Sequence, residues 1–207
     1  MTVIAIDGTF ASGKGTLGKR LAAHYGLSYL DTGKLYRAAA YAVMQAGDDP
    51  EDADHAAQAA KALTGQELDN PILKSGEVAV NASKVAVHPE VRQALFQFQR
   101  DFAAKGAVLD GRDIGTVICP DADVKFYVDA KAEVRAKRRH MELTGYGEEI
   151  TFETVLAQLV ERDNRDKNRK EAPLKAANDA HLIETSELGI DEVFNIAVRI
   201  TDGVLGQ

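Results

Sequence analysis

A glycine-rich loop near the beginning of the sequence constrains the fold more than any other feature. The loop reads Gly8-Thr9-Phe10-Ala11-Ser12-Gly13-Lys14-Gly15-Thr16. It follows an apolar run and leads into apolar residues at helical spacing, and Gly, four residues and then Gly-Lys is the pattern of a P-loop. The sequence therefore predicts a strand over 3–7, a helix over about 14–25 and a polyphosphate site between them.

Each residue type in this loop suits a polyphosphate. Glycines let successive backbone N–H groups converge on one anion, and the helix adds free N–H groups and the positive end of its dipole. Lys14 supplies a charge for the outer phosphates. The hydroxyl that usually meets magnesium is displaced, because Gly15 holds its place and Thr16 follows. A chance match by a Gly/Ser-rich turn is the alternative, and the flanking strand and helix disfavour it.

The rest of the chain alternates between short apolar runs and amphipathic segments. Further strands are expected at about 29–31, 107–110, 124–128 and 180–183, and a small one at Val78-Ala79-Val80. Helices are expected at about 34–45, 53–63, 89–102, 132–143, 151–168 and 191–200. This alternation predicts an α/β fold, a parallel sheet flanked by helices. A length of 207 residues without an evident linker suits one domain.

Composition restricts the classes of protein that the chain can belong to. The net charge of −7 disfavours non-specific binding to nucleic acid. Cys119 is the only cysteine, so no internal disulfide can form and a reducing cytoplasm is expected. We expect no membrane partner, because no apolar run approaches the length of a membrane span and no signal peptide is evident.

Asp110-Gly111-Arg112-Asp113 follows the strand predicted over 107–110. Ligands of open parallel sheets bind beyond the carboxyl ends of strands, and an aspartate there can orient magnesium or its water shell. For Asp110 alone, a turn aspartate that binds only local backbone is an equal alternative. Arg112 favours a binding site, because an arginine on such a loop can hold a phosphate through two N–H groups.

Two later helices carry arginines on one face. Their spacing of three and four residues groups Arg135, Arg138 and Arg139 in the first helix, and Arg162, Arg165, Asp166 and Arg169 in the second. Solvated faces with exposed ion pairs are the plain alternative, since such pairs contribute little to stability. We favour a role in phosphoryl transfer, because the protein is acidic and much of its arginine gathers here.

Taken together, these motifs resemble those of bacterial cytidylate kinases, in the nucleoside monophosphate kinase group, over nearly the whole chain. The resemblance rests on Gly13-Lys14-Gly15-Thr16, on Asp31-Thr32-Gly33 with Tyr36-Arg37, on Asp110 to Thr116, and on Glu161 to Arg169. It implies transfer of the terminal phosphoryl group of ATP to CMP or dCMP by a monomer that uses Mg²⁺. It also accounts for the displaced hydroxyl, since family members hold magnesium largely through water and phosphates.

The resemblance implies roles for individual residues. The acceptor phosphate would be held by Thr32, Arg37, Arg112 and Arg169, beside Tyr36. Cytosine would be read by Ser83, Arg92 and Asp113, and the ribose would meet Arg162 and Asp166. The donor phosphates would meet residues 8–16 and a lid with Arg135, Arg138 and Arg139. The catalytic groups would be Lys14, Arg112, Arg135, Arg139 and Arg169, with Mg²⁺ held indirectly by Thr16 and Asp110.

The resemblance also divides the chain. Residues 1–33 and 105–207 would form the core, with a helical lid at about 131–168. Residues of about 34–104 would form the acceptor-binding region. Longer family members carry a mostly antiparallel β insert before the Arg92 helix, and here it is shortened to about 66–86.

The cytosine edge supports the implied base specificity, because its mixed acceptors and donor suit an arginine, a hydroxyl and a carboxylate. At one of these positions uracil would present a hydrogen-bonding group of the opposite kind, so buried groups of the protein would be left unpaired. The main alternative is another P-loop kinase that acts on a different monophosphate or a small metabolite. A GTP-binding switch is disfavoured, because the sequence has no Asn-Lys-x-Asp motif. A nucleic-acid module is disfavoured because aromatic and basic residues are not interleaved.

Overall fold

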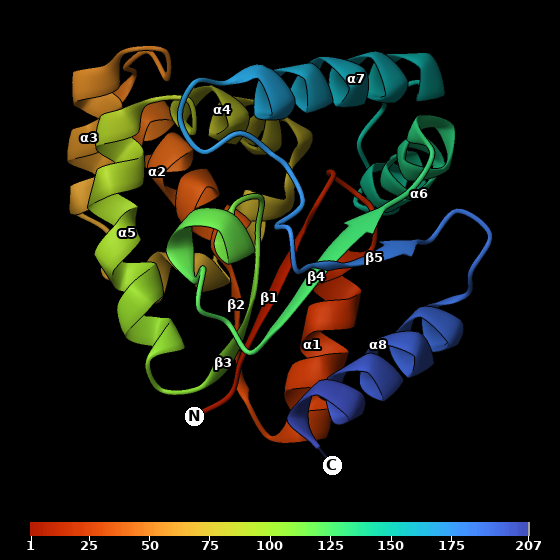
Figure 1. Ribbon diagram of the computed structural model, residues 1–207. Coiled ribbons are helices and arrows are strands. Elements are labelled where there is room, and N and C mark those ends of the chain that lie inside the picture. Colours follow the sequence, from red (N-terminus) through yellow and green to blue (C-terminus); the bar gives the residue numbers. More distant parts are fainter. Residues whose placement is uncertain (207) are drawn as a thin grey trace.

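Figure 1 shows the computed structural model of the chain, which describes residues 1–206. Within these residues, one parallel sheet has the strand order β2-β3-β1-β4-β5. Its strands are β1 (Val3–Gly8), β2 (Ser28–Asp31), β3 (Ala107–Asp110), β4 (Val124–Asp129) and β5 (His181–Glu184). The predicted α/β fold with a parallel sheet is confirmed.

Helices cover both faces of the sheet (Figure 1). One face carries α1 (Lys14–Tyr25) and α8 (Ile190–Leu205), and the other carries α2 (Thr32–Ala46), α3 (Ala53–Lys61) and α5 (Pro89–Ala103). A further group lies in the upper part of Figure 1, beyond the carboxyl ends of the strands. It consists of α4 (Gly76–Val85), α6 (Ala132–Gly145) and α7 (Phe152–Asn168). Among the described residues, no helix combines the length and apolar character that a membrane span requires.

The central strands pack on both faces because successive side chains point to opposite sides. In β1, Ala5 joins the cluster beneath α2, α3 and α5, whereas Ile4 and Ile6 join the cluster beneath α1 and α8. In β3, Leu109 and Val108 divide in the same way. Burial of each large aliphatic side chain stabilises the fold by about 1.5–3 kcal/mol. The near-continuous apolar runs in the sequence therefore reflect strands that are buried on two sides.

The strand register brings several polar chain segments to one edge of the sheet. Asp31 at the end of β2 is in register with Asp110 at the end of β3, and Asp110 is in register with Ile6 of β1. Because β1 lies between β3 and β4, the strand order reverses where the chain leaves β1. Ligands of such sheets bind at this reversal, so the fold places the P-loop at the expected position.

The regular elements of segment 66–86 are all helical, so the prediction of a small strand at Val78-Ala79-Val80 is wrong. Two short 3₁₀ turns precede α4, which begins after Ser75. The Ser75 hydroxyl caps this helix by accepting the N–H of Val78 at 3.3 Å. Residues 78, 79, 82 and 85 are buried at helical spacing. Three apolar residues in a row are compatible with the period of a strand and with that of a helix. Packing of α4 against α2 favours the helix.

Candidate active site

A cavity of about 510 Å³ lies at the carboxyl edge of the sheet. Most of the predicted site residues line it, namely residues 10–16, Thr32, Tyr36, Arg37, Ser83, Arg92, Asp110, Arg112, Asp113, Arg138, Arg139, Arg162, Asp166 and Arg169. The predicted residues outside its lining are Gly8, Thr9, Arg135 and Arg165. Motifs that are far apart in the sequence therefore meet around one cavity.

The P-loop curls as its glycine pattern predicts. Ala11 and Gly13 have φ angles of +61° and +97°, which turn the backbone back on itself. The Lys14 ammonium donates to the Thr9 carbonyl at 2.6 Å, and the Ser12 hydroxyl donates to the same oxygen at 3.0 Å. Because α1 begins at Lys14, its free N–H groups and positive dipole end face the cavity.

Gly8 and Thr9 shape the loop from outside the cavity. A Cβ atom at position 8 would lie 1.9 Å from the Val128 carbonyl oxygen, so only glycine fits there. The Thr9 hydroxyl donates to the Asp129 carboxylate at 2.5 Å. These contacts fix the beginning of the P-loop against β4, and the Thr9 hydroxyl is engaged by Asp129.

Asp110 lies beneath the start of α1, where its carboxylate accepts the Tyr29 hydroxyl at 3.2 Å. Burial and the neighbouring Asp31 carboxylate raise the pKa of Asp110, while Lys14 and Arg112 oppose that shift. Burial and the charge of Arg112 lower the pKa of Lys14, while Asp110 opposes that shift. Sequence reasoning missed Tyr29, although its place just before a strand end was a signal.

Asp31 also lines the cavity, and sequence reasoning gave it no role of its own. Together with Asp110 and Thr16 it forms an oxygen-rich wall beside Lys14. Such ligands suit Mg²⁺, which usually keeps several of its waters. Among residues 1–206, no three His, Cys, Asp or Glu side chains gather closely enough to hold a metal ion. The carboxylates of Asp31 and Asp110 would fit a Mg²⁺ ion that keeps most of its waters.

Asp166 of α7 organises one side of the arginine cluster. Its carboxylate accepts the Arg112 Nε–H at 2.9 Å and lies 3.9 Å from both Arg162 and Arg169. Burial alone would raise the pKa of Asp166, but the three arginines hold it below its usual value. Arg162, Asp166 and Arg169 thus share a face, as the helical spacing predicted. Arg165, which the same spacing placed with them, instead contacts Ser83 and Glu161 and lies outside the cavity.

Asp113 organises the other side of the cluster. Its carboxylate is paired with Arg92 of α5 and lies 3.8 Å from Arg169. The Tyr36 ring stacks below Arg92, with 5.6 Å between the guanidinium carbon and the ring centroid. The nearby Ser83 hydroxyl donates to the Val80 carbonyl at 2.9 Å.

Positive charge exceeds negative charge at this end of the cavity. Burial, together with nearby arginines, lowers the pKa of Arg162 to about 9, even though Asp166 opposes that shift. Burial also lowers the pKa of Arg37, and Arg139 and Arg112 add to the effect. Buried guanidiniums that destabilise one another would be stabilised by an anion. The arrangement is therefore an anion site opposite the P-loop.

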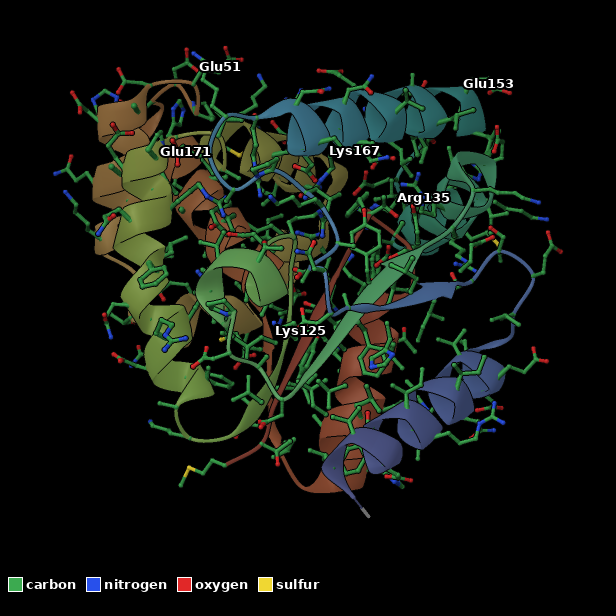
Figure 2. All side chains as sticks on the ribbon, in the orientation of Figure 1. Glu51, Lys125, Arg135, Glu153, Lys167 and Glu171 are labelled. Carbon is green, nitrogen blue, oxygen red and sulfur yellow. The ribbon has the colours of Figure 1, made fainter. Side chains whose placement is uncertain are left out.

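Arg135 does not share the cavity with the other predicted arginines. Its guanidinium is buried, pairs with Asp163 at 2.7 Å and donates to the carbonyl oxygens of Ala130 and Phe10 at 2.7 and 3.1 Å. Figure 2 labels Arg135 in the region of α6. The spacing of three and four residues predicted a common helix face for these arginines. It could not show that Asp163 of α7 would pair with Arg135.

Arg138 and Arg139 do line the cavity. Arg138 donates to the Thr185 hydroxyl at 3.0 Å and to the Thr185 carbonyl at 2.7 Å. Arg139 donates to the Lys74 carbonyl at 3.1 Å and pairs with Glu142 at 2.8 Å. The first helix therefore contributes two arginines to the cavity, where the sequence predicted three.

The sequence also gave no indication of one apolar end of the cavity. Its walls there are Leu188, Ile190 and Val193, and Thr185 lies beside them. Thr185 directly follows β5, so the rule that ligands bind beyond strand ends could have identified it. The apolar residues carry no polar motif and could be placed only by the fold.

Asp7 has a structural position. Its two carboxylate oxygens accept the backbone N–H groups of Ile114 and Gly115, each at 2.7 Å. Burial raises the pKa of Asp7 to about 6, and these two hydrogen bonds oppose the shift. The side chain fixes the turn after Asp113 and does not line the cavity.

Comparisons with known proteins identify the family of the chain. The family model described as cytidylate kinase matches residues 4–202. Curated proteins named "Cytidylate kinase" from Nitrobacter winogradskyi and Rhodopseudomonas palustris are 53% and 54% identical, each over 98% of this chain and 96% of its own length. A solved structure of an uncharacterized protein from Eubacterium ventriosum has 17% identity and a TM-score of 0.57, covering 98% of this chain and 99% of its own, and shares the fold. The chain belongs to the cytidylate kinase family.

Proposed function

We propose that the protein transfers the terminal phosphoryl group of ATP to CMP or dCMP, giving ADP and CDP or dCDP. Membership of the cytidylate kinase family supports this reaction. The observation that carries the proposal is one cavity with a P-loop on one side and a cluster of partly uncompensated arginines on the other. A cavity with two anion sites suits a donor and an acceptor that both carry phosphate.

The donor would bind at the P-loop, with its phosphates on the N–H groups of α1 and on Lys14. Its base would lie toward the apolar wall of Leu188, Ile190 and Val193. Mg²⁺ would be held through Thr16 and the Asp110 carboxylate, and it would neutralise charge on the phosphates when bound.

The acceptor phosphate would meet Arg37, Arg112 and Arg169. Arg112 is already oriented by Asp166, so a bound phosphate would find it in place. Cytosine would lie toward Asp113, Arg92 and Ser83, which all line the cavity. A buried carboxylate can accept a hydrogen bond from the cytosine amino group. It cannot donate one to the carbonyl that uracil has at the same place.

The chemistry needs little beyond alignment and charge. The attacking group is a phosphate oxygen that is already ionised at neutral pH, so a strong general base is not required. Lys14 and the arginines around the cavity would stabilise charge on the travelling phosphoryl group. All the groups lie on one chain, which supports action as a monomer.

We also propose that α6 and α7, within about 131–168, act as a lid that closes over the donor phosphates and contacts the acceptor-binding region of about 34–104. Helices α6 and α7 have a small hydrophobic core of their own, formed by Ala136, Leu143, Val155 and Leu159. Glu148, between them, accepts the Gly76 N–H at 2.9 Å, and Arg162 donates to the Ala79 carbonyl at 3.1 Å. Contacts of this kind would exclude water from the cavity and protect ATP from hydrolysis.

A panel of monophosphates tests the proposed reaction. Initial rates with ATP and Mg²⁺ would be measured for CMP, dCMP, UMP and AMP in a coupled assay for ADP. We expect the largest kcat/KM values for CMP and dCMP. A larger value for another acceptor, or ADP formation that does not depend on any monophosphate, would contradict the proposal.

A further inference from the structure

Phe10 of the P-loop contributes more than backbone to the site. Its ring packs against the hydrophobic core of α6 and α7, which consists of Ala136, Leu143, Val155 and Leu159. A P-loop binds phosphate through N–H groups and its lysine, and neither function needs an aromatic side chain. The ring of Phe10 therefore serves another purpose.

Two arginines of the cavity stack against this ring. The guanidinium carbon of Arg162 lies 4.2 Å from the ring centroid, and that of Arg139 lies 5.5 Å from it. Both distances fall within the range of cation–π attraction. Arg162 comes from α7 and Arg139 from α6, so one aromatic ring contacts a cavity-lining arginine from each helix.

Arg162 depends on such a contact, because its other partners hold it loosely. Its Nε–H is buried without a hydrogen-bond partner among the described residues. The Arg162–Asp166 separation is 3.9 Å, and one Nη–H donates to the Ala79 carbonyl at 3.1 Å. The face of Phe10 restricts the orientation of a guanidinium that few hydrogen bonds define.

The backbone of Phe10 is attached to the same helices. Arg135 donates to the Phe10 carbonyl at 3.1 Å, and its guanidinium is also held by both carboxylate oxygens of Asp163, at 3.2 and 2.7 Å. Side chain and backbone at position 10 thus connect the phosphate-binding loop to α6 and α7. Arg135 is thus buried outside the cavity, where its guanidinium holds the Phe10 backbone.

We propose that Phe10 is a positioning residue, which orients Arg162 and Arg139 over the cavity and couples the P-loop to α6 and α7. The inference rests on the proposed function, because it assigns these arginines to the nucleotide site. The proposed role depends on the π face of the Phe10 ring. It does not rest on apolar volume alone, which any large aliphatic side chain could supply.

Three variants separate the π face from simple packing. Phe10→Leu keeps most of the apolar volume and removes the ring, and Phe10→Tyr keeps the ring. Val155→Ala weakens the core of α6 and α7, against which the ring packs, and keeps the phenylalanine itself. Each variant would be assayed for kcat and KM with CMP, for CMP affinity by calorimetry and for its Tm. The assays would be run well below the lowest Tm, so that every variant is folded.

We expect Phe10→Leu to lower kcat/KM for CMP by about 5- to 30-fold, the range that a buried cation–π contact implies. Its CMP affinity should fall as well, while Phe10→Tyr stays within about threefold of the wild type. Val155→Ala should lower the Tm and leave kcat/KM within about the same limit.

The proposal is overturned if Phe10→Leu matches the wild type, or if Phe10→Tyr or Val155→Ala loses as much kcat/KM as Phe10→Leu. Failure of the proposed function is a separate result, since the wild-type protein would then show no transfer to CMP in the same assay.

Discussion

At the residue scale, two buried aspartates determine how the arginines of the cavity are arranged. Asp166 contacts Arg112, Arg162 and Arg169, and Asp113 contacts Arg92 and Arg169. Arg169 is therefore shared between both carboxylates, at distances of 3.8 and 3.9 Å. These separations are too long for hydrogen bonds. The guanidinium donates through Nε and one Nη to the Ala172 carbonyl, at 2.8 and 2.6 Å, and keeps its remaining N–H groups for a phosphate.

Arg169→Ala tests that shared position. The substitution should lower kcat/KM for CMP roughly 30- to 1,000-fold, because it removes a buried partner of the acceptor phosphate. This corresponds to a loss of about 2–4 kcal/mol in transition-state stabilisation. Arg199→Ala is the matched control, since Arg199 is exposed on α8 and does not line the cavity. Steady-state kinetics and circular dichroism of both variants would be compared. Near-normal turnover of folded Arg169→Ala would rule out the role.

Asp113→Asn tests base reading. The amide keeps the size of the carboxylate but offers a donor as well as an acceptor, so uracil should no longer be penalised as strongly. We expect the ratio of kcat/KM for CMP to that for UMP to fall by about 10-fold or more, the size of one mispaired buried hydrogen bond. The ratio is its own control, because loss of the Arg92 pair affects both substrates. An unchanged ratio would contradict the assignment.

At the scale of elements, the predictions succeeded where a short stretch of sequence determines its own structure. The P-loop has its strand, its turn and its helix within about 25 residues, and each is signalled by glycines or by apolar spacing. Strand ends and arginine faces follow from the same local periods. This is why the P-loop, the Asp110 loop and the arginine faces could be proposed from the residue pattern. The resemblance to a known family, and not any local period, named Thr32, Tyr36, Arg37, Ser83 and Arg92.

The predictions failed where a distant partner decides the structure. Val78-Ala79-Val80 became helical through packing on α2, and Arg135 left the cavity because Asp163 of α7 pairs with it. The apolar wall around Ile190 has no local pattern that marks it as a binding surface. In each case the structure depends on residues that are not neighbours in the sequence.

Gly18→Ala tests packing between α1 and β2. A Cβ atom at Gly18 would lie 2.7 Å from the Tyr29 ring, so the ring or the helix must move. We expect a loss of about 1–3 kcal/mol in the free energy of unfolding, typical of overpacking.

Gly203→Ala is the matched control for that loss. It makes the same change in α8, where a Cβ atom would meet no atom within 4 Å. It should stabilise the protein by up to about 1 kcal/mol through helix propensity. Urea denaturation measures both variants, and equal effects at the two glycines would contradict the packing argument.

At the scale of the whole molecule, α6 and α7 reach across the cavity to the acceptor-binding region. Glu148 accepts the Gly76 N–H at 2.9 Å, and Arg139 donates to the Lys74 carbonyl at 3.1 Å. The Lys74 ammonium also lies 5.7 Å from the Tyr146 ring centroid. These contacts close the upper part of the molecule in Figure 1, and they join segments that are not otherwise packed on the sheet.

Glu148→Ala tests the contribution of this contact to closure. It should lower kcat/KM for CMP by about 2- to 10-fold, since one hydrogen bond contributes about 0.5–1.5 kcal/mol. Glu148→Gln keeps an acceptor for the Gly76 N–H and should lose less. The two variants would be compared by steady-state kinetics. Equal losses in both, or no loss in Glu148→Ala, would show that this hydrogen bond does not assist closure.

The central claim is that one cavity holds ATP at the P-loop and a cytidine monophosphate at the arginine cluster. Transfer of label from ATP carrying a radioactive terminal phosphate tests it most directly. With CMP present, we expect the label to appear in CDP in a single turnover, with little free phosphate, and we expect Lys14→Met to abolish the transfer. Label released as inorganic phosphate whether or not CMP is present, or passed to UMP or AMP in preference to CMP, would contradict the claim.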